Sequence, residues 1–430
     1  MWICSQIGSR EHYAVPRALH RGGEAATLYT DFWAGPITRA VTGRVEWGAI
    51  RSLATRYHQE LNGRQKLENG SLVRSWNFHA LWWEAQSRRK RKSESGNVYQ
   101  NFIEVGHRFA VLVCEALKRR SDLGPDCIFF AYDTGALEAL KWCREQGIKC
   151  VLNQMDPNRV EVELVRAEEQ RWPGWKLKTI QVPEEYFARR EQEWALADRV
   201  VVNSEFSRQA LLQQGVPAEK LVVVPLCYEA NADALNVESR NEVTDTPPPP
   251  RPASGHEQVE LRVLFLGQVI LRKGIQYLLA AARKLEREKI HFDVVGPIGI
   301  SREAMATAPG NVTFHGRTGR DQAAGWYRRS QVFVLPTLSD GFAITQLEAM
   351  AHGLPVIATP CCGEVVSNGV DGFVVPASDP DSLVAVLKRY LSEPGLLEAH
   401  RSAALEKSKQ FTLQRLTNNL LNLQLALMKK

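Results

Sequence analysis

The sequence predicts an α/β protein with two doubly wound parallel sheets, and three observations support this prediction. The chain has 430 residues, more than one hydrophobic core usually serves. Short apolar runs alternate with segments of helical periodicity over most of its length. Residues 229–258 instead contain Asn, Ala, Glu and Ser and then four consecutive prolines, which is typical of an exposed linker. We therefore predict an N-terminal domain over residues 1–228, a C-terminal domain over 259–395 and a helical segment over 396–430.

The first domain is predicted to begin with a strand, a loop and a helix. Apolar residues place the strand at Ile3–Ile7 and the helix at Tyr13–His20, where Pro16 suits the first helical turn. The next strand is expected at Ala26–Thr30. The later elements are helix Phe109–Arg119, strand Cys127–Tyr132, helix Gly135–Gln146, strand Lys149–Gln154 and strand Leu221–Pro225. Ser204 is expected to cap a further helix.

Ligands of doubly wound sheets bind at the carboxyl ends of the strands. Gly8 and Ser9 follow the first strand and can offer backbone N–H groups to an anion, and His12 lies in the same loop. Asp133 and Asp156 directly follow two later strands. These five residues are our candidates for one wall of a ligand cleft. Alternatively, the first loop is an ordinary turn, Asp133 caps a helix, and Asp156 begins an Asp-Pro turn.

Residues 31–100 contain one readable pattern, in which apolar and aromatic residues at helical spacing precede a basic run. The spaced residues are Leu72, Trp76, His79 and Trp83. The run Arg88–Lys92 carries five positive charges. A basic, Trp-rich helix can lie on an anionic membrane surface, so Trp76–Lys92 is a candidate for peripheral membrane contact. The alternatives are a buried aromatic face with a solvated charged end, or a nucleic-acid patch. No nucleic-acid motif accompanies the charges, so we expect no nucleic-acid partner.

The second domain is predicted to alternate strands and helices in the same way. The expected strands are Leu261–Leu266, His291–Val295, Val312–Gly316, Val332–Leu335 and Val356–Thr359. The expected helices are Ile275–Arg287, Ala343–His352, one that runs from Asp379 to Leu391, and Phe411–Met428. The last helix has leucines at helical spacing. It can cross back to the first domain or serve as a dimer helix.

The stretch from Val332 to Thr359 reads as strand, loop, helix and strand, and it predicts a ligand site. The free N–H groups of a helix start at the carboxyl edge of a sheet form an anion site. Asp340 precedes the helix, and Glu348 lies eight positions later, roughly 9 Å along the helix from its start. A diphosphate at the helix start would place a ribose near Glu348 and a sugar near Asp340. Alternatively, Asp340 is an N-cap and Glu348 is a solvated helix position.

Two cations precede another predicted helix. The strand Leu261–Leu266 is followed by Gly267 and Gln268, and then by Arg272 and Lys273 just before a glycine. Cations beside a helix start suit a diphosphate, and arginine can bind one bidentately. Alternatively, they are surface charges on a first helical turn.

Asp340–Phe342 and Leu347–Thr359 together resemble the E-x7-E segment of retaining GT-B glycosyltransferases, and most closely that of glycosyltransferase family 4. Glu193–Ser204 also resembles that family. The resemblance implies two Rossmann-like domains that face each other across a cleft, and transfer of a sugar with retention. The donor would be a nucleotide diphosphate sugar, and the acceptor a glycan, a lipid or a small molecule. The acceptor would bind at the cleft wall of the first domain, which includes Gly8, Ser9, His12, Asp133 and Asp156. Catalytic roles are implied for Arg272, Lys273, Asp340 and Glu348. The implied donor-binding residues are Gly267, Gln268, Gly316, Arg317, Gly341, Phe342, Ala343, Ile344 and Thr345.

The sequence departs from the family pattern at three positions. Asp340 replaces the first glutamate, Gln268 replaces an arginine, and no histidine follows the strand that ends before Met155. These departures support two rival functions, a non-catalytic GT-B binding module and a nucleotide-sugar epimerase of the same architecture.

Composition predicts a cytoplasmic protein, either free or peripheral to the inner face of the membrane. No signal peptide and no run of ~20 apolar residues is visible. The net charge of +6 comes mostly from the basic run. The eight cysteines show no metal-ligand spacing and are expected to be reduced core thiols. No Asp-x-Asp pair appears in the stretches expected to face the cleft, so we expect no metal. No cofactor is expected beyond the donor, which is a co-substrate.

Overall fold

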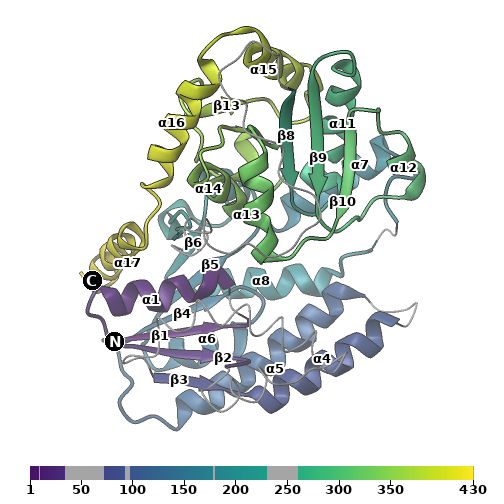
Figure 1. Cartoon of the computed structure of the whole chain (residues 1–430). Coiled ribbons are helices and arrows are strands. Elements are labelled where there is room, and N and C mark those ends of the chain that lie inside the picture. The colour runs from purple at the N-terminus through teal and green to yellow at the C-terminus, as the bar shows by residue number, and fades with distance from the viewer. Residues whose placement is uncertain (9, 34–71, 93–96, 178–179, 230–259, 430) are drawn as a thin grey trace, which may run out of the picture.

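The structure is a computed structural model that describes all residues except 9, 34–71, 93–96, 178–179, 230–259 and 430 (Figure 1). Its described part contains one sheet of seven strands and one of six. In spatial order the first sheet consists of β3 (Leu72–Ser75), β2 (Ala26–Thr30), β1 (Trp2–Gln6), β4 (Ile128–Tyr132), β5 (Lys149–Gln154), β6 (Arg199–Val202) and β7 (Leu221–Val223). The second consists of β10 (Val312–Gly316), β9 (Ile290–Val295), β8 (Leu261–Leu266), β11 (Val332–Leu335), β12 (Val356–Ala358) and β13 (Gly372–Val374).

All pairings between these strands are parallel. Helices cover both faces of each sheet, and central strands such as β4 and β11 are therefore buried along their whole length (Figure 1). The strand order reverses between β1 and β4 in the first sheet, and between β8 and β11 in the second. Ligand sites of such sheets lie beyond the carboxyl ends of strands at these reversals.

Helices and short 3-10 turns connect the strands. In the first half these are η1 (Arg10–Tyr13), α1 (Ala14–Arg21), α4 (Asn77–Lys92), α5 (Val98–Lys118), α6 (Leu137–Glu145), α7 (Arg159–Arg171), α8 (Glu184–Leu196), α9 (Glu205–Gln213) and η3 (Ala218–Lys220). In the second half they are η4 (Leu271–Lys273), α11 (Ile275–Lys284), α12 (Arg302–Ala306), α13 (Arg320–Arg329), α14 (Ile344–Ala351), η5 (Pro360–Cys362), α15 (Pro380–Ser392), α16 (Leu396–Ser408) and α17 (Leu413–Met428). Most predicted elements occur within a few residues of their expected bounds. As predicted, the Ser204 hydroxyl caps α9 by accepting from the Ser207 N–H group.

Two helices cross from one domain to the other. The C-terminal helix α17 returns to the first domain and lies beside α1, where the Thr417 hydroxyl donates to the Ala18 carbonyl at 3.0 Å (Figure 1). Of the two alternatives for this helix, the structure therefore shows the crossing back. In the opposite direction, α7 leaves the first sheet and packs on the second domain. There Glu168 accepts hydrogen bonds from the Tyr277 hydroxyl at 2.8 Å and from the Gln276 amide at 3.0 Å.

The helical prediction that began at Leu72 was wrong, because Leu72 lies in strand β3 and the helix α4 begins only at Asn77. Trp76 and Trp83 pack inward, Trp76 against Tyr29 at 6.1 Å, while Trp83 is 5% exposed. The aromatic stripe is thus mainly a core face. The opposite side of α4 exposes Phe78 and other apolar side chains. No described helix is long and apolar enough to cross a membrane.

Candidate donor and acceptor sites

A glycine brings the two predicted cations to the loop after β11. Gly274 ends η4 with a φ of 76°, and a Cβ atom there would lie 1.8 Å from the Pro336 carbonyl oxygen. Only glycine allows this approach without strain. The two segments are then joined by hydrogen bonds, because the Leu338 N–H group donates to the Arg272 carbonyl at 2.9 Å and the Arg272 guanidinium donates to the Ser339 carbonyl at 2.8 Å.

Both cations of this site pair with carboxylates. Lys273 forms an ion pair with Asp340, and Arg272 lies 3.8 Å from the same carboxylate. Arg272 also lies 3.3 Å from Glu161, which reaches the site from the first turn of α7. Arg272, Lys273 and Asp340, which were predicted from separate motifs, therefore meet in one cluster. Glu161 was not predicted.

Glu161 is held by two donors from the second domain. Besides Arg272, the Ser339 hydroxyl donates to its carboxylate at 2.9 Å. Burial raises the pKa of Glu161 to about 7, against the lowering effect of Arg272. Sequence spacing could not have identified this residue, because its role depends on the docking of α7 across the domain boundary.

One backbone N–H group at the start of α14 already has a hydrogen-bond partner within the protein. The N-cap of this helix is Ala343, whose N–H group donates to the Cys362 carbonyl at 3.1 Å. The expectation that this N–H group is available to a ligand was therefore wrong, as was the alternative in which Asp340 is the N-cap. Ile344 and Thr345 begin the helix, so their N–H groups have no carbonyl partner within it. Phe342 is buried and contacts Phe411 at a ring distance of 6.2 Å.

Glu348 lies further along α14 and is half-buried rather than solvated. Its carboxylate accepts a hydrogen bond from the Tyr327 hydroxyl at 2.8 Å, and the Tyr327 ring stacks on His352 at 5.1 Å. Tyr327 comes from α13, so two helices fix the position of this carboxylate. Sequence reasoning did not identify Tyr327.

The remaining predicted donor residues line the carboxyl ends of β8 and β10. Gly267 follows β8, and the next residue, Gln268, is exposed. Gly316 ends β10 with a φ of 70°, and its carbonyl accepts from the Gly296 N–H group at 2.7 Å. Arg317 follows and is exposed. These residues therefore share one edge of the second sheet with η4 and α14.

The loop after β1, which was predicted to bind an anion through backbone N–H groups, has a different structure. The Gly8 N–H group donates to the Asp31 carboxylate at 2.8 Å, so an internal anion already occupies it. Burial raises the pKa of Asp31. Ser9 lies outside the described residues. His12 lies in a run of left-handed residues between β1 and α1, with a φ of 52°. The prediction that Gly8 offers its N–H group to a ligand was wrong, because Asp31 supplies the carboxylate from a position far along the chain.

Asp133 and Asp156 are brought together by a buried arginine that the sequence did not reveal. Arg190 on α8 pairs with Asp133, and it also pairs with Asp156 at 2.8 Å. Burial raises the pKa of Asp133 more than Arg190 lowers it. Burial alone would raise the pKa of Asp156, but the charge and hydrogen bonds of Arg190, together with the Asn158 N–H group and the charge of Arg272, lower it. Asp133 is not the cap of α6, whereas Asp156 does form a turn by accepting from the Asn158 N–H group at 2.8 Å.

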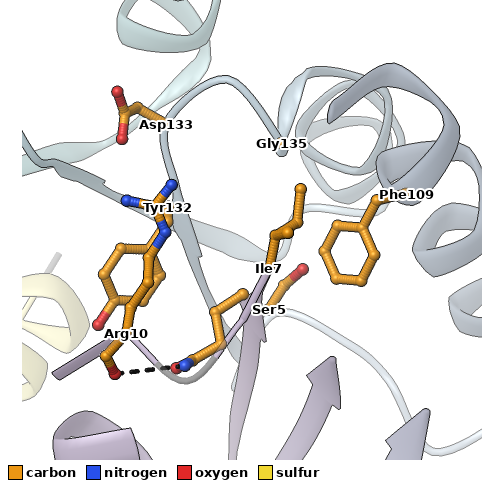
Figure 2. Close-up of a pocket in the computed structure, with 8 residues that line it drawn as sticks. Ser5, Ile7, Arg10, Phe109, Tyr132, Asp133 and Gly135 are labelled. Carbon is orange, nitrogen blue, oxygen red and sulfur yellow. Dashed lines mark hydrogen bonds between the residues drawn. The ribbon is translucent and has the colours of Figure 1, made fainter. Parts of the chain in front are cut away.

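A small pocket lies beside Asp133 at the carboxyl edge of the first sheet. Figure 2 shows the Arg10 side chain as it passes the Tyr132 ring towards Asp133, with Ser5 and Ile7 on the opposite wall. The two candidate sites approach each other nearby, since a Cβ atom at Gly341 would lie 2.1 Å from the Met155 carbonyl oxygen. The acceptor loop after β5 and the donor loop after β11 are therefore in contact.

Two further predictions concern metals and cysteines. The described ranges contain no group of three or more His, Cys, Asp or Glu side chains placed to hold a metal ion. That the reaction needs no metal stays a prediction. All eight cysteines are free thiols, and Cys4, Cys114, Cys127 and Cys150 are buried as expected.

Comparison with known proteins supports the resemblance found in the sequence. Residues 260–393 match the model of the family described as glycosyl transferases group 1. The D-inositol 3-phosphate glycosyltransferase of Streptomyces griseus subsp. griseus is 31% identical over 175 residues, which are 36% of this chain and 37% of that protein. The corresponding protein of Streptomyces bingchenggensis is 29% identical over 250 residues, or 51% of each chain. The matches thus span about a third to a half of these relatives.

Solved structures match over the whole length. The sucrose-phosphate synthase of Thermosynechococcus elongatus aligns with a TM-score of 0.62 at 16% identity, covering 100% of this chain and 99% of that chain. HepE of Anabaena, in a complex with UDP and glucose, aligns with a TM-score of 0.56 at 13% identity and 99% coverage of both chains. These similarities concern the fold alone, and they confirm the predicted GT-B architecture.

Proposed function

We propose that this chain, a GT-B protein whose C-terminal domain matches glycosyl transferases group 1, moves a sugar from a nucleotide diphosphate sugar to an acceptor with retention of configuration. One observation carries the proposal. Arg272 and Lys273 meet Asp340 in front of α14, at the strand-order reversal of the second sheet. Two cations and a helix start in one place suit a diphosphate.

Each donor residue has a role in this proposal. Arg272, Lys273 and the N–H groups of Ile344 and Thr345 stabilise the charge that develops on the departing diphosphate, which is usually the largest contribution to catalysis. Glu348 holds the ribose, with its carboxylate fixed by a hydrogen bond from α13. Asp340 binds sugar hydroxyls once the donor has drawn Lys273 away from it.

The acceptor binds at the carboxyl edge of the first sheet, near Asp133 and Asp156. No carboxylate is assigned as a covalent nucleophile, so the acceptor attacks from the face that the diphosphate leaves, and the departing phosphate accepts the acceptor proton. A trapped glycosyl-enzyme adduct would contradict this mechanism. The acceptor class is a glycan, a lipid or a small molecule.

The first test is a thermal-shift screen of the purified protein against nucleotide sugars and free nucleoside diphosphates. UDP and UDP-glucose come first, because a structural neighbour is described with UDP and glucose. A ligand at ~100 times its dissociation constant adds about 2.7 kcal/mol to the free energy of unfolding. Glu348→Ala should lose the shift, whereas Glu303→Ala, an exposed change in the same domain, should keep it. No shift with any donor would contradict the proposal.

A non-catalytic binding module is the second candidate. The specific observation in its favour is that both cations of the donor site already have carboxylate partners, while the exposed Gln268 stands where the resembled family has an arginine. The two candidates differ in turnover. A module would bind a nucleotide without releasing UDP from UDP-glucose in the presence of any acceptor.

We further propose that the exposed side of α4 contacts an anionic membrane surface. Phe78 is 80% exposed and Trp82 is 47% exposed, on the helix that ends in the basic run. Co-sedimentation with phosphatidylserine vesicles should exceed that with phosphatidylcholine vesicles, and Phe78→Asp should reduce it. Equal sedimentation with both vesicle types would exclude an electrostatic contact.

A further inference from the structure

The charges of the donor site cancel in the ligand-free protein. Arg272 and Lys273 contribute two positive charges, and Asp340 and Glu161 contribute two negative charges in direct contact with them. A diphosphate that enters this cluster gains little net attraction while both carboxylates stay ionised. Full binding of the diphosphate by the cations therefore requires that one of the two acids moves or accepts a proton.

Glu161 is the acid that comes from outside the second domain. It is carried by α7, whose later turns are fixed to the second domain through Glu168, with hydrogen bonds from Tyr277 and Gln276. A second attachment follows α7, where the Ser301 N–H group donates to the Trp175 carbonyl at 2.7 Å. Because the helix is anchored at its far end, its first turn cannot swing freely away from Arg272.

The groups that face Glu161 come from four elements. From the second domain these are Arg272 of η4 and, in the loop after β11, the hydroxyl of Ser339 and the carboxylate of Asp340. From the first domain they are Asp156 after β5 and Tyr99 of α5. Asp156 is paired with Arg190 but still raises the pKa of Glu161, whereas Arg272 is the main charge that keeps Glu161 ionised. A diphosphate that draws Arg272 away removes this support and adds negative charge.

We propose that Glu161 is a positioning residue of the donor site, which holds the Arg272 guanidinium until a nucleoside diphosphate replaces it, and that Glu161 then takes up one proton from solvent. The inference deepens the proposed function and rests on it. The proton converts the Glu161 carboxylate to a carboxylic acid, and no covalent bond to the donor forms or breaks. The neutral acid can still accept a hydrogen bond from the Ser339 hydroxyl, so the loop keeps its place.

The sign of the pH dependence follows directly. The ligand-free pKa of Glu161 is raised to about 7, and the bound diphosphate raises it further. Between pH 7 and pH 8.5 binding therefore requires proton uptake, and the affinity for the nucleotide falls by up to about tenfold per pH unit. Below pH 6 Glu161 is already protonated, and its contribution to the pH dependence disappears.

The test is titration calorimetry of the full chain with UDP, GDP and ADP at pH 8, in two buffers that differ in ionisation enthalpy. For the nucleotide that binds, we expect uptake of roughly one proton by the wild type. Glu161→Gln should show no uptake from this group and should bind several-fold more tightly at pH 8, because the amide cannot carry the competing charge. Glu163→Gln, an exposed position on the same helix, should behave like the wild type.

The outcomes separate this inference from the function on which it rests. Equal proton uptake by the wild type and Glu161→Gln overturns the inference and leaves the donor site intact. Absence of binding by all three nucleotides, to the wild type and to both variants, overturns the proposed function and the inference with it. Should Glu161→Gln not fold, the dissociation constant of the wild type from pH 6 to pH 8.5 decides, since a flat profile contradicts proton uptake.

Discussion

Replacement of Gly274 by alanine should push η4 away from the loop that follows β11. The position has a φ of 76°, which costs an alanine ~1–2 kcal/mol. Its Cβ atom would lie 1.8 Å from the Pro336 carbonyl oxygen, whereas real Cβ atoms keep at least 3.0 Å, so the two segments must separate by about 1.2 Å. Forced separation in a packed region costs a further ~1–3 kcal/mol. We expect Gly274→Ala to lower the free energy of unfolding by about 2–5 kcal/mol in total.

Gly353→Ala is the matched control for the cost of placing an alanine at a positive φ. Gly353 lies in the same domain with a φ of 72°, but a Cβ atom there meets nothing within 4 Å. Urea unfolding should show a loss of only ~1–2 kcal/mol for this variant. UDP binding should weaken at least ~10-fold in Gly274→Ala, a change of about 1.4 kcal/mol, because Arg272 and Lys273 move with η4. Equal losses of stability and of UDP affinity in the two variants would refute this reasoning.

Three further substitutions test other contacts. Gly341→Ala places a Cβ atom 2.1 Å from the Met155 carbonyl oxygen, so it should push the two domains apart. We expect kcat/KM to fall at least ~10-fold and the free energy of unfolding to fall by ~1–3 kcal/mol. Tyr327→Phe removes the hydrogen bond to Glu348, and it should raise the KM for the donor several-fold with little change in kcat. An unchanged KM would exclude a positioning role for Tyr327. Arg190→Met leaves the buried carboxylate of Asp133 and the half-buried carboxylate of Asp156 without their cation, and it should cost ~3–5 kcal/mol in urea unfolding. The loss should be smaller at pH 4 than at pH 7, because protonation removes the unpaired charges; an equal loss at both pH values would contradict this explanation.

Local patterns predicted much of the second domain because its strands are buried runs with clear ends. The bounds of β8, β10 and β11 agree with the prediction residue for residue. In a parallel sheet the carboxyl ends of the strands share one edge, and the resemblance implied catalytic roles in one site for residues that follow β8 and β11. The contacts of Arg272 and Lys273 with Asp340 agree with that expectation. Their functional roles remain proposals.

Predictions from the sequence were wrong where the structure of a residue depends on a partner that is distant in the chain. The Gly8 N–H group was correctly placed after β1, but its partner Asp31 comes from the end of β2. Leu72 matched a helical spacing that continues into α4, yet pairing with β2 places it in a strand. A spacing of four residues does not distinguish these outcomes, because the even interval also keeps both residues on one face of a strand.

The α7 helix shows most clearly why the site could not be assembled from the sequence alone. No element was predicted over its residues, Arg159–Arg171, and helical periodicity alone does not identify the domain on which a helix packs. In the structure Asp156, just before α7, is held by Arg190 of the first domain, whereas Glu161, in its first turn, is held by Arg272 of the second. Any movement that separates the domains must therefore break one of these ion pairs or bend the chain between them. Asn158 lies there with a φ of 57°, a conformation that is unfavourable for most residues and that its contacts with Arg190 and Gln214 maintain. The acceptor edge and the donor edge are thus coupled through a few residues, and a change at Asn158 should alter donor affinity although it touches no donor residue.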